Sequence, residues 1–564
     1  MFAPVNHRLA FISVVHFLIL MLSRSLRHRA PVLWLVLPFA GGLAVAHVAG
    51  CATRPVGWLA GAALVLAAAL FLSQRPLCWG ALLTCGGLLA GIGYYALRRD
   101  RLPAWDALPP REVQAVIEVE RLFARRAGSR TDGGLARIVR APPIAADLAG
   151  QPIAFSLPLV PAFPRPARGE HLEVVGVLEP LPRTASPSSF DGYLANAGVN
   201  YRLARGRMLT RVQTPGVYQS FCDAARARLS RILELGISHR PDLLAVLRGM
   251  VLGETAELRP DQETLFLRSG TMHLFSISGL HIAAIAVALH MLVGLLRLPA
   301  PVRSLLTVAA LWLYVDITGT SPSAVRAFVM VMVFEAALTL ERPINPLSTL
   351  ATAALVTLAV EPMQLFGASF QMSYGIVAGL LLLGLPLGEW LQEMTRPFRH
   401  RPRVLWTRMH HGLAWFQRAL ASGVAIGLAT SLVSTVATVL YFKMATPAAL
   451  LANLVLVPLS SFALWAGFLS LLCGLMRADA LAIVFNHAGA LVLVVMEAAI
   501  RVFVVLPAAY AEGAFTSPTA GYVTFAGLLI LLGAGYCWRW EWRAGGVLPP
   551  FLWLAAALVW WVRW

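Results

Sequence analysis

The polar groups best suited to chemistry in this sequence stand at the start of a long apolar run, residues 282–296. They are two histidines, two serines and a glycine: His273, Ser276, Ser278, Gly279 and His281. Polar and ionisable groups are costly in lipid, so in membrane segments they usually line a path or a site inside the protein. A glycine among them also lets a helix break, and broken helices persist in membranes where they line protein or a cavity. The segment predicts an internal polar path, with hydrogen-bonded structural histidines as the alternative.

Four later apolar runs also carry polar residues. The candidates in them are Asp316, Ser323, Arg326, Glu335, Gln371, Ser373 and Asn453. Arg326 would lie about one turn into a span that begins near Pro322. An arginine costs roughly 2.5–3.5 kcal/mol at the bilayer centre and much less where it can snorkel to the interface. We expect Arg326 to face an internal path for an anionic substrate, because Asp316 and Glu335 also indicate a polar interior. A snorkelling side chain and an ion pair with Asp316 are the alternatives.

No pattern in the sequence indicates an enzyme. The segment 276–279 resembles the Gly-x-Ser-Gly motif of rhomboid-type intramembrane serine proteases, but its first glycine is missing. His281 follows on the same segment, where it would not easily hold a serine in attack geometry. There is no His-x-His-x-Asp-His metal motif, phosphate-binding loop or Gly-x-Gly-x-x-Gly segment, and the six cysteines form no Cys-x-x-Cys pair. We expect no catalytic residue, no metal and no cofactor, and keep the protease only as an alternative.

The elements around these residues are those of a polytopic α-helical membrane protein. Of 564 residues, 58% are hydrophobic and 13% are charged, which is more apolar surface than a soluble chain of this length needs. About thirteen apolar runs are long enough to span a bilayer: 31–50, 57–73, 77–97, 273–296, 302–319, 322–340, 346–360, 366–387, 418–441, 446–475, 480–506, 519–537 and 547–562. The run 446–475 is too long for one straight span, so we expect it to break near Pro458.

A soluble insertion separates the third and fourth runs. Residues 98–240 carry 21 arginines against 13 acidic residues, and 112–119 and 171–177 alternate like β-strands. Short strands with Pro- and Gly-rich turns predict a small β-barrel or sandwich. We predict five units: 1–97, a leader and three transmembrane helices; 98–215, a mainly β domain; 216–270, amphipathic helices with a polar pair over about 241–270; 271–475, a helical core; and 476–564, further transmembrane helices.

The arginines predict an orientation, because cytoplasmic loops collect positive charge. With a cytoplasmic N-terminus, Arg297, Arg342, the cluster 396–408, Arg477 and Arg539 all fall on cytoplasmic loops. Residues 98–215 then lie on the outer, periplasmic side.

The apolar segment 9–22 is too short to span and is followed by arginines. We interpret it as a re-entrant or poorly ordered leader, or as sequence upstream of a true start at Met21. We do not expect a cleaved signal peptide there.

Several segments resemble the ComEC family, the inner-membrane channels of natural transformation. They are 247–281 with Ser-Ile-Ser-Gly-Leu-His, 312–327 with Ser-Pro-Ser-x-x-Arg, 370–373, 452–458, and 189–194 followed by Gly198. The resemblance implies that 98–215 is an extracytoplasmic OB-fold-like domain, that 271–475 is the competence channel core, and that the protein lies in the bacterial inner membrane. It also implies that single-stranded DNA passes into the cytoplasm beside the polar residues named above.

The resemblance also implies partners. These are single-stranded DNA, a periplasmic DNA receptor and type IV pilus machinery, a cytoplasmic helicase or single-strand-binding proteins, and the lipid bilayer. The metallo-β-lactamase-like domain found in many relatives is not expected here, so a separate nuclease would degrade the other strand. A path for single-stranded DNA needs scattered cations and faces on which bases can slide. A transporter of another anionic polymer or solute is the alternative function.

Overall fold

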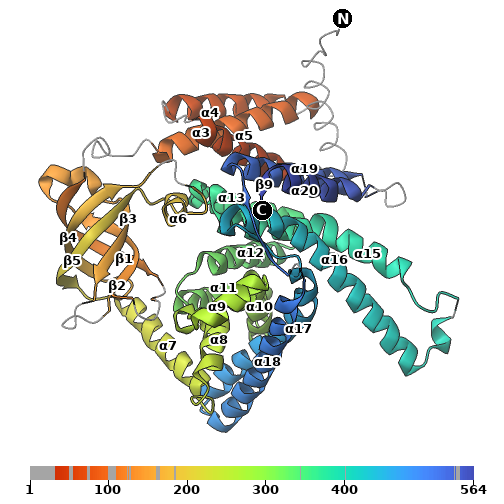
Figure 1. Cartoon of the computed structure of the whole chain (residues 1–564). Helices are drawn as coiled ribbons and strands as arrows, with labels where there is room; N and C mark the ends of the chain where they lie inside the picture. The colour runs from red at the N-terminus through yellow and green to blue at the C-terminus, as the bar shows by residue number, and fades with distance from the viewer. Residues whose placement is uncertain are drawn as a thin grey trace, which may run out of the picture.

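The computed structural model describes residues 32–564 except 50–54, 73–75, 100–109, 124, 126–128, 160–164, 183–185, 343–344, 401, 508, 539 and 541–545. Figure 1 shows a β-barrel set beside a large helical body. The apolar segment 9–22 and Met21 lie outside the described residues.

Thirteen apolar segments of the described chain are helical, one for each predicted run. Nine are long and apolar enough to cross a membrane, and four are shorter, so the chain is a multi-pass membrane protein, while the count of thirteen spans stays a prediction. The helices are α3 (Leu33–Ala49), α4 (Pro55–Phe71), α5 (Pro76–Arg99), α10 (Gly279–Gly294), α11 (Ala300–Ile317), α12 (Pro322–Thr339), α13 (Pro346–Val360), α14 (Ala368–Gly379) continuing through the π-turn η7 (Leu380–Gly384) into α15 (Leu385–Met394), α16 (Arg408–Phe442), α17 (Ala449–Leu475), α18 (Asp479–Val505), α19 (Pro518–Cys537) and α20 (Leu548–Trp560).

The expected break near Pro458 is wrong, because α17 runs unbroken through that proline. The hydroxyls of Ser460 and Ser461 both donate to the Val457 carbonyl oxygen, at 2.8 and 3.0 Å. Transmembrane helices tolerate proline where side chains and neighbouring helices satisfy the backbone around it. At 1.5 Å per residue α17 is about 40 Å long, and tilting accommodates the excess over the hydrocarbon thickness.

The soluble insertion folds as a closed five-stranded barrel, and both predicted strands are confirmed. The strands are β1 (Arg111–Leu122), β2 (Thr131–Arg140), β3 (Pro152–Pro158), β4 (His171–Pro180) and β5 (Tyr201–Gln213). They close in the order β1-β2-β3-β5-β4, and only the β3–β5 pair is parallel. Alternate side chains fill the interior, as with Leu172, Val174 and Leu178 of β4. The turn η3 (Pro143–Leu148) precedes β3, and the short helix α6 (Phe190–Asn196) joins β4 to β5.

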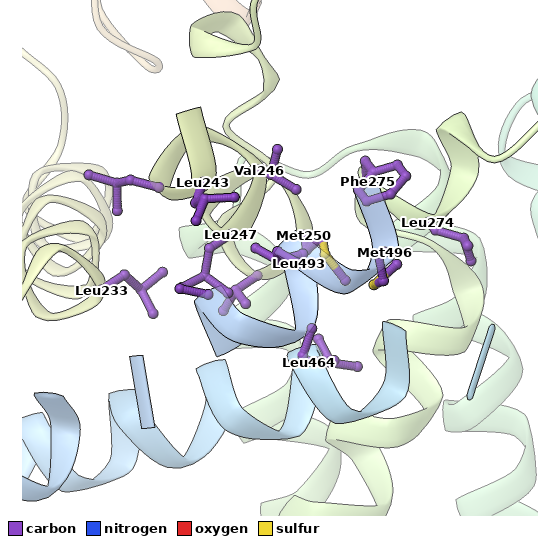
Figure 2. Close-up of a cluster of buried hydrophobic side chains, with 14 of the residues drawn as sticks. Leu233, Leu243, Val246, Leu247, Met250, Leu274, Phe275, Leu464, Leu493 and Met496 are labelled. Atoms are coloured by element: carbon purple, nitrogen blue, oxygen red, sulfur yellow. The ribbon is translucent and has the colours of Figure 1, made fainter. Parts of the chain in front are cut away.

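Three helices connect the barrel to the helical core: α7 (Val217–Glu234), α8 (Pro241–Leu252) and α9 (Pro260–Arg268). The expected polar pair is wrong for α8, which buries nine of its twelve residues. Figure 2 shows its Leu243, Leu247 and Met250 among side chains of α17 and α18, such as Leu464 and Met496. The sequence misled because Asp242 and Arg248 sit within an otherwise apolar helix.

Close backbone contact joins the first described helices, which lie side by side at one end of the molecule (Figure 1). A Cβ on Gly42 of α3 would lie 2.1 Å from the Leu88 carbonyl oxygen, and one on Gly91 of α5 would lie 2.2 Å from the Phe39 carbonyl oxygen. Small residues let membrane helices approach this closely. The packing of α3 on α5 therefore requires glycine at both positions.

Short elements complete the described structure. They are the turns η4 (Thr255–Glu257), η5 (Met272–Leu274), η6 (Pro362–Phe366) and η8 (Arg403–Leu405), and two small antiparallel pairs, β6 (Met444–Ala445) with β7 (Ala511–Glu512) and β8 (Ala514–Phe515) with β9 (Val562–Arg563). The predicted unit boundaries at 97, 215, 270 and 475 stay predictions.

Candidate functional site in the helical core

Arg326 is a buried cation held only by hydroxyl groups. Its side chain is 3% exposed, and its Nη2 donates to Ser369 Oγ at 2.6 Å and to Ser373 Oγ at 3.0 Å, both on α14. The guanidinium Nε is buried without a hydrogen-bond partner. No carboxylate in the described part of the chain forms an ion pair with it. A buried charge is normally paired, because desolvation costs several kcal/mol per ion. The charge of Arg326 is therefore not neutralised by a carboxylate, and the guanidinium can bind an anion.

The snorkelling alternative for Arg326 does not fit this geometry. A snorkelling arginine keeps its charged head in water. Here the head is buried between α12 and α14, on side chains four residues apart along one face of α14. Ser369 was not among the residues predicted from the sequence. Its i,i+4 spacing to Ser373 was the available signal, because it places both serines on one face of a helix.

Ser278 and His281 form the N-terminal cap of α10. The Ser278 hydroxyl accepts from the His281 backbone N–H at 3.5 Å, and the Ser278 N–H donates to His281 Nδ1 at 3.4 Å. This is a reciprocal capping box. It does not pair a serine hydroxyl with an imidazole base, so the geometry gives the intramembrane protease no support.

The cap leaves one ring nitrogen of His281 without a hydrogen-bond partner. Since Nδ1 accepts a hydrogen bond, the proton of the neutral ring is on Nε2, which is buried without a partner in the described residues. An orphan buried donor is costly and calls for an acceptor.

The capped start of α10 and the Arg326 turn of α12 lie next to each other in the helical core. Ser323 donates to the Ile277 carbonyl oxygen at 2.9 Å, and a Cβ on Gly279 would lie 3.8 Å from that of Ala327. The N-termini of α10 and α12 therefore meet beside Arg326. Figure 1 shows these two helices together in the body of the molecule.

The other predicted residues do not all lie beside Arg326. Gln371 donates to the Leu365 carbonyl oxygen at 3.1 Å, and its Oε1 is buried without a partner. Asn453 of α17 also has an unpartnered buried Oδ1, but no hydrogen bond in the described residues joins it to Arg326. Ser276 is half-buried and His273 is exposed. The structure thus gathers Ser278, His281, Ser323, Arg326 and Ser373, with the exposed His273 near His281, while no hydrogen bond joins Asn453 to this group in the described residues.

Glu335 belongs to a second polar group. Its carboxylate lies 2.8 Å from His290 Nδ1 on α10 and accepts from the Ser304 hydroxyl on α11 at 2.7 Å. It is nine residues beyond Arg326, or about 13 Å along α12. His290 and Ser304 were missed, although an ionisable residue inside an apolar run is itself a signal. This group joins three helices to one another.

Asp316 pairs with Arg168, not with Arg326. Arg168 lies between β3 and β4 of the barrel, and its Nη1 contacts the buried Asp316 carboxylate at the end of α11. The suggested Asp316–Arg326 ion pair is therefore wrong. Asn196 of α6 makes a second link by donating to the Phe366 carbonyl oxygen in η6, at 3.1 Å. These two contacts attach the barrel to the helical core.

The comparisons with known proteins identify the family of this chain. Residues 250–542, just over half of the chain, match the family described as Competence protein. The chain belongs to this competence protein family. The matched region contains α10 to α19, and so includes Arg326, both of its serine partners and the Glu335 group.

Two curated relatives resemble parts of this competence-family chain. ComE operon protein 3 of Bacillus subtilis (strain 168) is 25% identical over 217 residues, which are 38% of this chain and 27% of that protein. Competence protein ComA of Neisseria gonorrhoeae is 32% identical over 149 residues, which are 25% of this chain and 21% of that protein. The aligned segments thus span about a quarter of each relative. No solved structure matches the chain significantly.

Proposed function

We propose that this competence-family protein passes single-stranded DNA through the bacterial inner membrane during natural transformation. The match to the competence protein family and to Competence protein ComA supports a role in DNA uptake. Transit requires no bond to be made or broken in the DNA, so the proposal assigns no catalytic residue, metal or cofactor to this chain.

The state of Arg326 is the observation that carries the proposal. Glu335, Asp316 and Arg226 at the core each have a partner of opposite or titratable charge. Arg326 has two hydroxyls instead. A guanidinium held by neutral groups can exchange one phosphate oxygen for the next, because no fixed carboxylate competes with the passing anion. The partnerless Nε2 of His281 adds a second donor on the neighbouring helix.

The contacts between the barrel and the ends of the core helices support the proposed orientation. The barrel contacts the end of α11 through Asp316, and η6 through Phe366, and the arginine pattern assigns both to the outer side. The Glu335 group then lies in the inner half of the bilayer. Arg326 would be an outer-half contact that a strand meets soon after leaving the barrel.

The barrel suits an outer receiving domain. Its closed strand order β1-β2-β3-β5-β4 supports an OB-like interpretation, and OB-folds bind oligonucleotides through the β2–β3 face and the loops after β1 and β4. We propose as partners a periplasmic DNA receptor with type IV pilus machinery, a cytoplasmic helicase or single-strand-binding proteins, and a separate nuclease. A transporter of another anionic polymer would use the same core, since a guanidinium does not distinguish among phosphate-bearing chains.

The test follows labelled duplex DNA in cells that lack the gene and carry one variant each. Arg326→Ala should leave DNA outside the inner membrane, Arg326→Lys should restore part of the delivery, and wild type should restore it fully. Arg501→Ala is the matched control, since Arg501 is an exposed arginine of α18 paired with Glu497. Unchanged delivery of label to the cytoplasm without the gene would overturn the proposal and favour the other cargo.

A further inference from the structure

Three aromatic rings gather at one end of the barrel, on the two loops that follow β1 and β4. Phe123 comes directly after β1, and Phe190 and Tyr193 lie on α6. The rings of Phe190 and Tyr193 are nearly parallel, with centroids 6.0 Å apart. The Phe123 ring packs edge-on against Phe190, with a centroid distance of 5.7 Å. Phe190 is 57% exposed and Tyr193 36%. Large aromatic side chains with so much free surface are unusual on a small barrel unless they contact something else.

The opposite face of α6 fixes these rings in place. Ser189 caps the helix by accepting from the Gly192 N–H at 3.0 Å, and a Cβ on Gly192 would lie 2.1 Å from the Ser186 carbonyl oxygen. Leu194 is fully buried in the barrel's edge with Leu181 and Val199. Since Gly192 and Leu194 face inward, Phe190 and Tyr193 are held outward.

Positive charge lies beside the rings. Residues 121–130 contain four arginines and no acidic residue. The guanidinium of Arg121 lies 5.6 Å from the Phe123 ring centroid and donates to the Tyr193 hydroxyl at 2.5 Å. The nearest acid on α6, Asp191, is already paired with Arg202 at 3.2 Å. The surface therefore combines exposed π-faces with Arg121, whose guanidinium forms no ion pair within the described residues, and this combination matches a chain of bases and phosphates.

The rings lie on the side of the barrel that is attached to the helical core. The last residue of α6, Asn196, donates to the Phe366 carbonyl oxygen, and Phe366 precedes Ser369 by three residues. Three extended residues span at most about 11 Å, so α6 is anchored close to the serine that holds Arg326. Figure 1 shows α6 between the barrel and the helical body.

The geometry points to a base-stacking site for single-stranded nucleic acid, made by Phe123, Phe190 and Tyr193 with Arg121 on the phosphates. This inference rests on the proposed function and adds to it the site that holds the strand before Arg326. Bases stack on aromatic side chains whatever their sequence, which suits a protein that must accept any strand. The strand's bases are held on the rings while its backbone passes Arg121.

The test uses the purified full chain in lipid nanodiscs and two probes of equal charge. One is a fluorescent 12-nucleotide oligodeoxythymidine and the other an abasic deoxyribose-phosphate chain of the same length, about one OB-sized site. The wild type should bind the thymidine probe more tightly than the abasic one. The double variant F190A/Y193A should lose roughly five- to a hundredfold in affinity for the thymidine probe, and bind the abasic probe as wild type does.

Three controls separate stacking from other effects. Phe190→Trp should keep the preference for the thymidine probe, because it retains a π-face. Leu209→Ala, at an exposed apolar position on β5, should change neither affinity. Single Phe190→Ala replaces the double variant if the latter unfolds at a lower temperature than wild type.

Three results would contradict the proposed stacking site. Equal, salt-sensitive binding of both probes by wild type would overturn stacking while leaving DNA transit intact. An unchanged thymidine affinity in F190A/Y193A would overturn it too. No binding of either probe by wild type would overturn both this site and the receiving role of the barrel.

Discussion

Arg326 Nη2 lies 2.6 Å from Ser369 Oγ and 3.0 Å from Ser373 Oγ, so one guanidinium nitrogen joins α12 to two successive turns of α14. Both partners are neutral. The contact orients the cation without neutralising it, and this separates Arg326 from a structural arginine locked to a carboxylate.

Placing a carboxylate beside Arg326 should block delivery of DNA to the cytoplasm without unfolding the protein. In Ser373→Asp the new carboxylate would pair with the guanidinium and compete with phosphate. We expect a loss of about tenfold or more, the equivalent of 1.4 kcal/mol. Ser373→Asn, which is polar but uncharged, should retain most delivery. Labelled-DNA delivery and the thermal unfolding temperature in detergent measure the two effects, and equal delivery by both variants would contradict the proposed role of the charge.

The Glu335 group should act as a structural link among three helices. Removing the carboxylate in Glu335→Ala leaves His290 and Ser304 without their acceptor, and should lower the free energy of unfolding by about 1–2 kcal/mol. A double-mutant cycle with His290→Ala should give a coupling energy of about 0.6–1.7 kcal/mol. Additive effects of the two substitutions would mean that the pair does not interact.

Adjacent glycines of α3 should respond differently to the same substitution. Gly42→Ala forces a Cβ to within 2.1 Å of the Leu88 carbonyl oxygen, so we expect a loss of stability of about 1–3 kcal/mol. Gly41 has nothing within 4 Å of its Cβ position. Gly41→Ala should therefore be neutral, or stabilise by up to about 1 kcal/mol through helix propensity. Thermal unfolding of both variants measures the difference, and equal effects would argue against close packing of α3 on α5.

Cys222 on α7 should react slowly with a thiol reagent at neutral pH. Burial raises the pKa of the Cys222 thiol, and the nearby Asp316 carboxylate raises it further. The thiolate is the reactive form, so its fraction at a given pH is smaller than for an ordinary cysteine, and labelling should rise at a higher pH than for an ordinary cysteine. The measurement is the labelling rate against pH in a variant whose other cysteines are serine.

A matched control keeps the serine background, replaces Cys222 by serine, and adds the exposed position Ala227→Cys on the same helix. That thiol should label faster and at lower pH. Rapid labelling of Cys222 at pH 7 would show that α7 is not packed against the core as described.

Local features determined much of this protein from the sequence. The apolar runs predicted the helices, because burying a helix in lipid requires an unbroken apolar stretch. Strand alternation over 171–177 predicted part of the barrel, since side chains alternate between its interior and solvent. The position of Arg326 in the first turns of α12 was predicted from its place after Pro322, and the family motifs predicted the competence family.

Tertiary structure alone decided which polar groups meet. Asp316 pairs with Arg168, 148 residues away, and Glu335 meets His290 and Ser304 from two other helices. Spacing along one helix tells which residues share a face, but it carries no information about the face that packs opposite. Whether Arg326 finds a carboxylate or two serines depends on how α12 rotates against α14, and that rotation is set by the packing of the whole helical core.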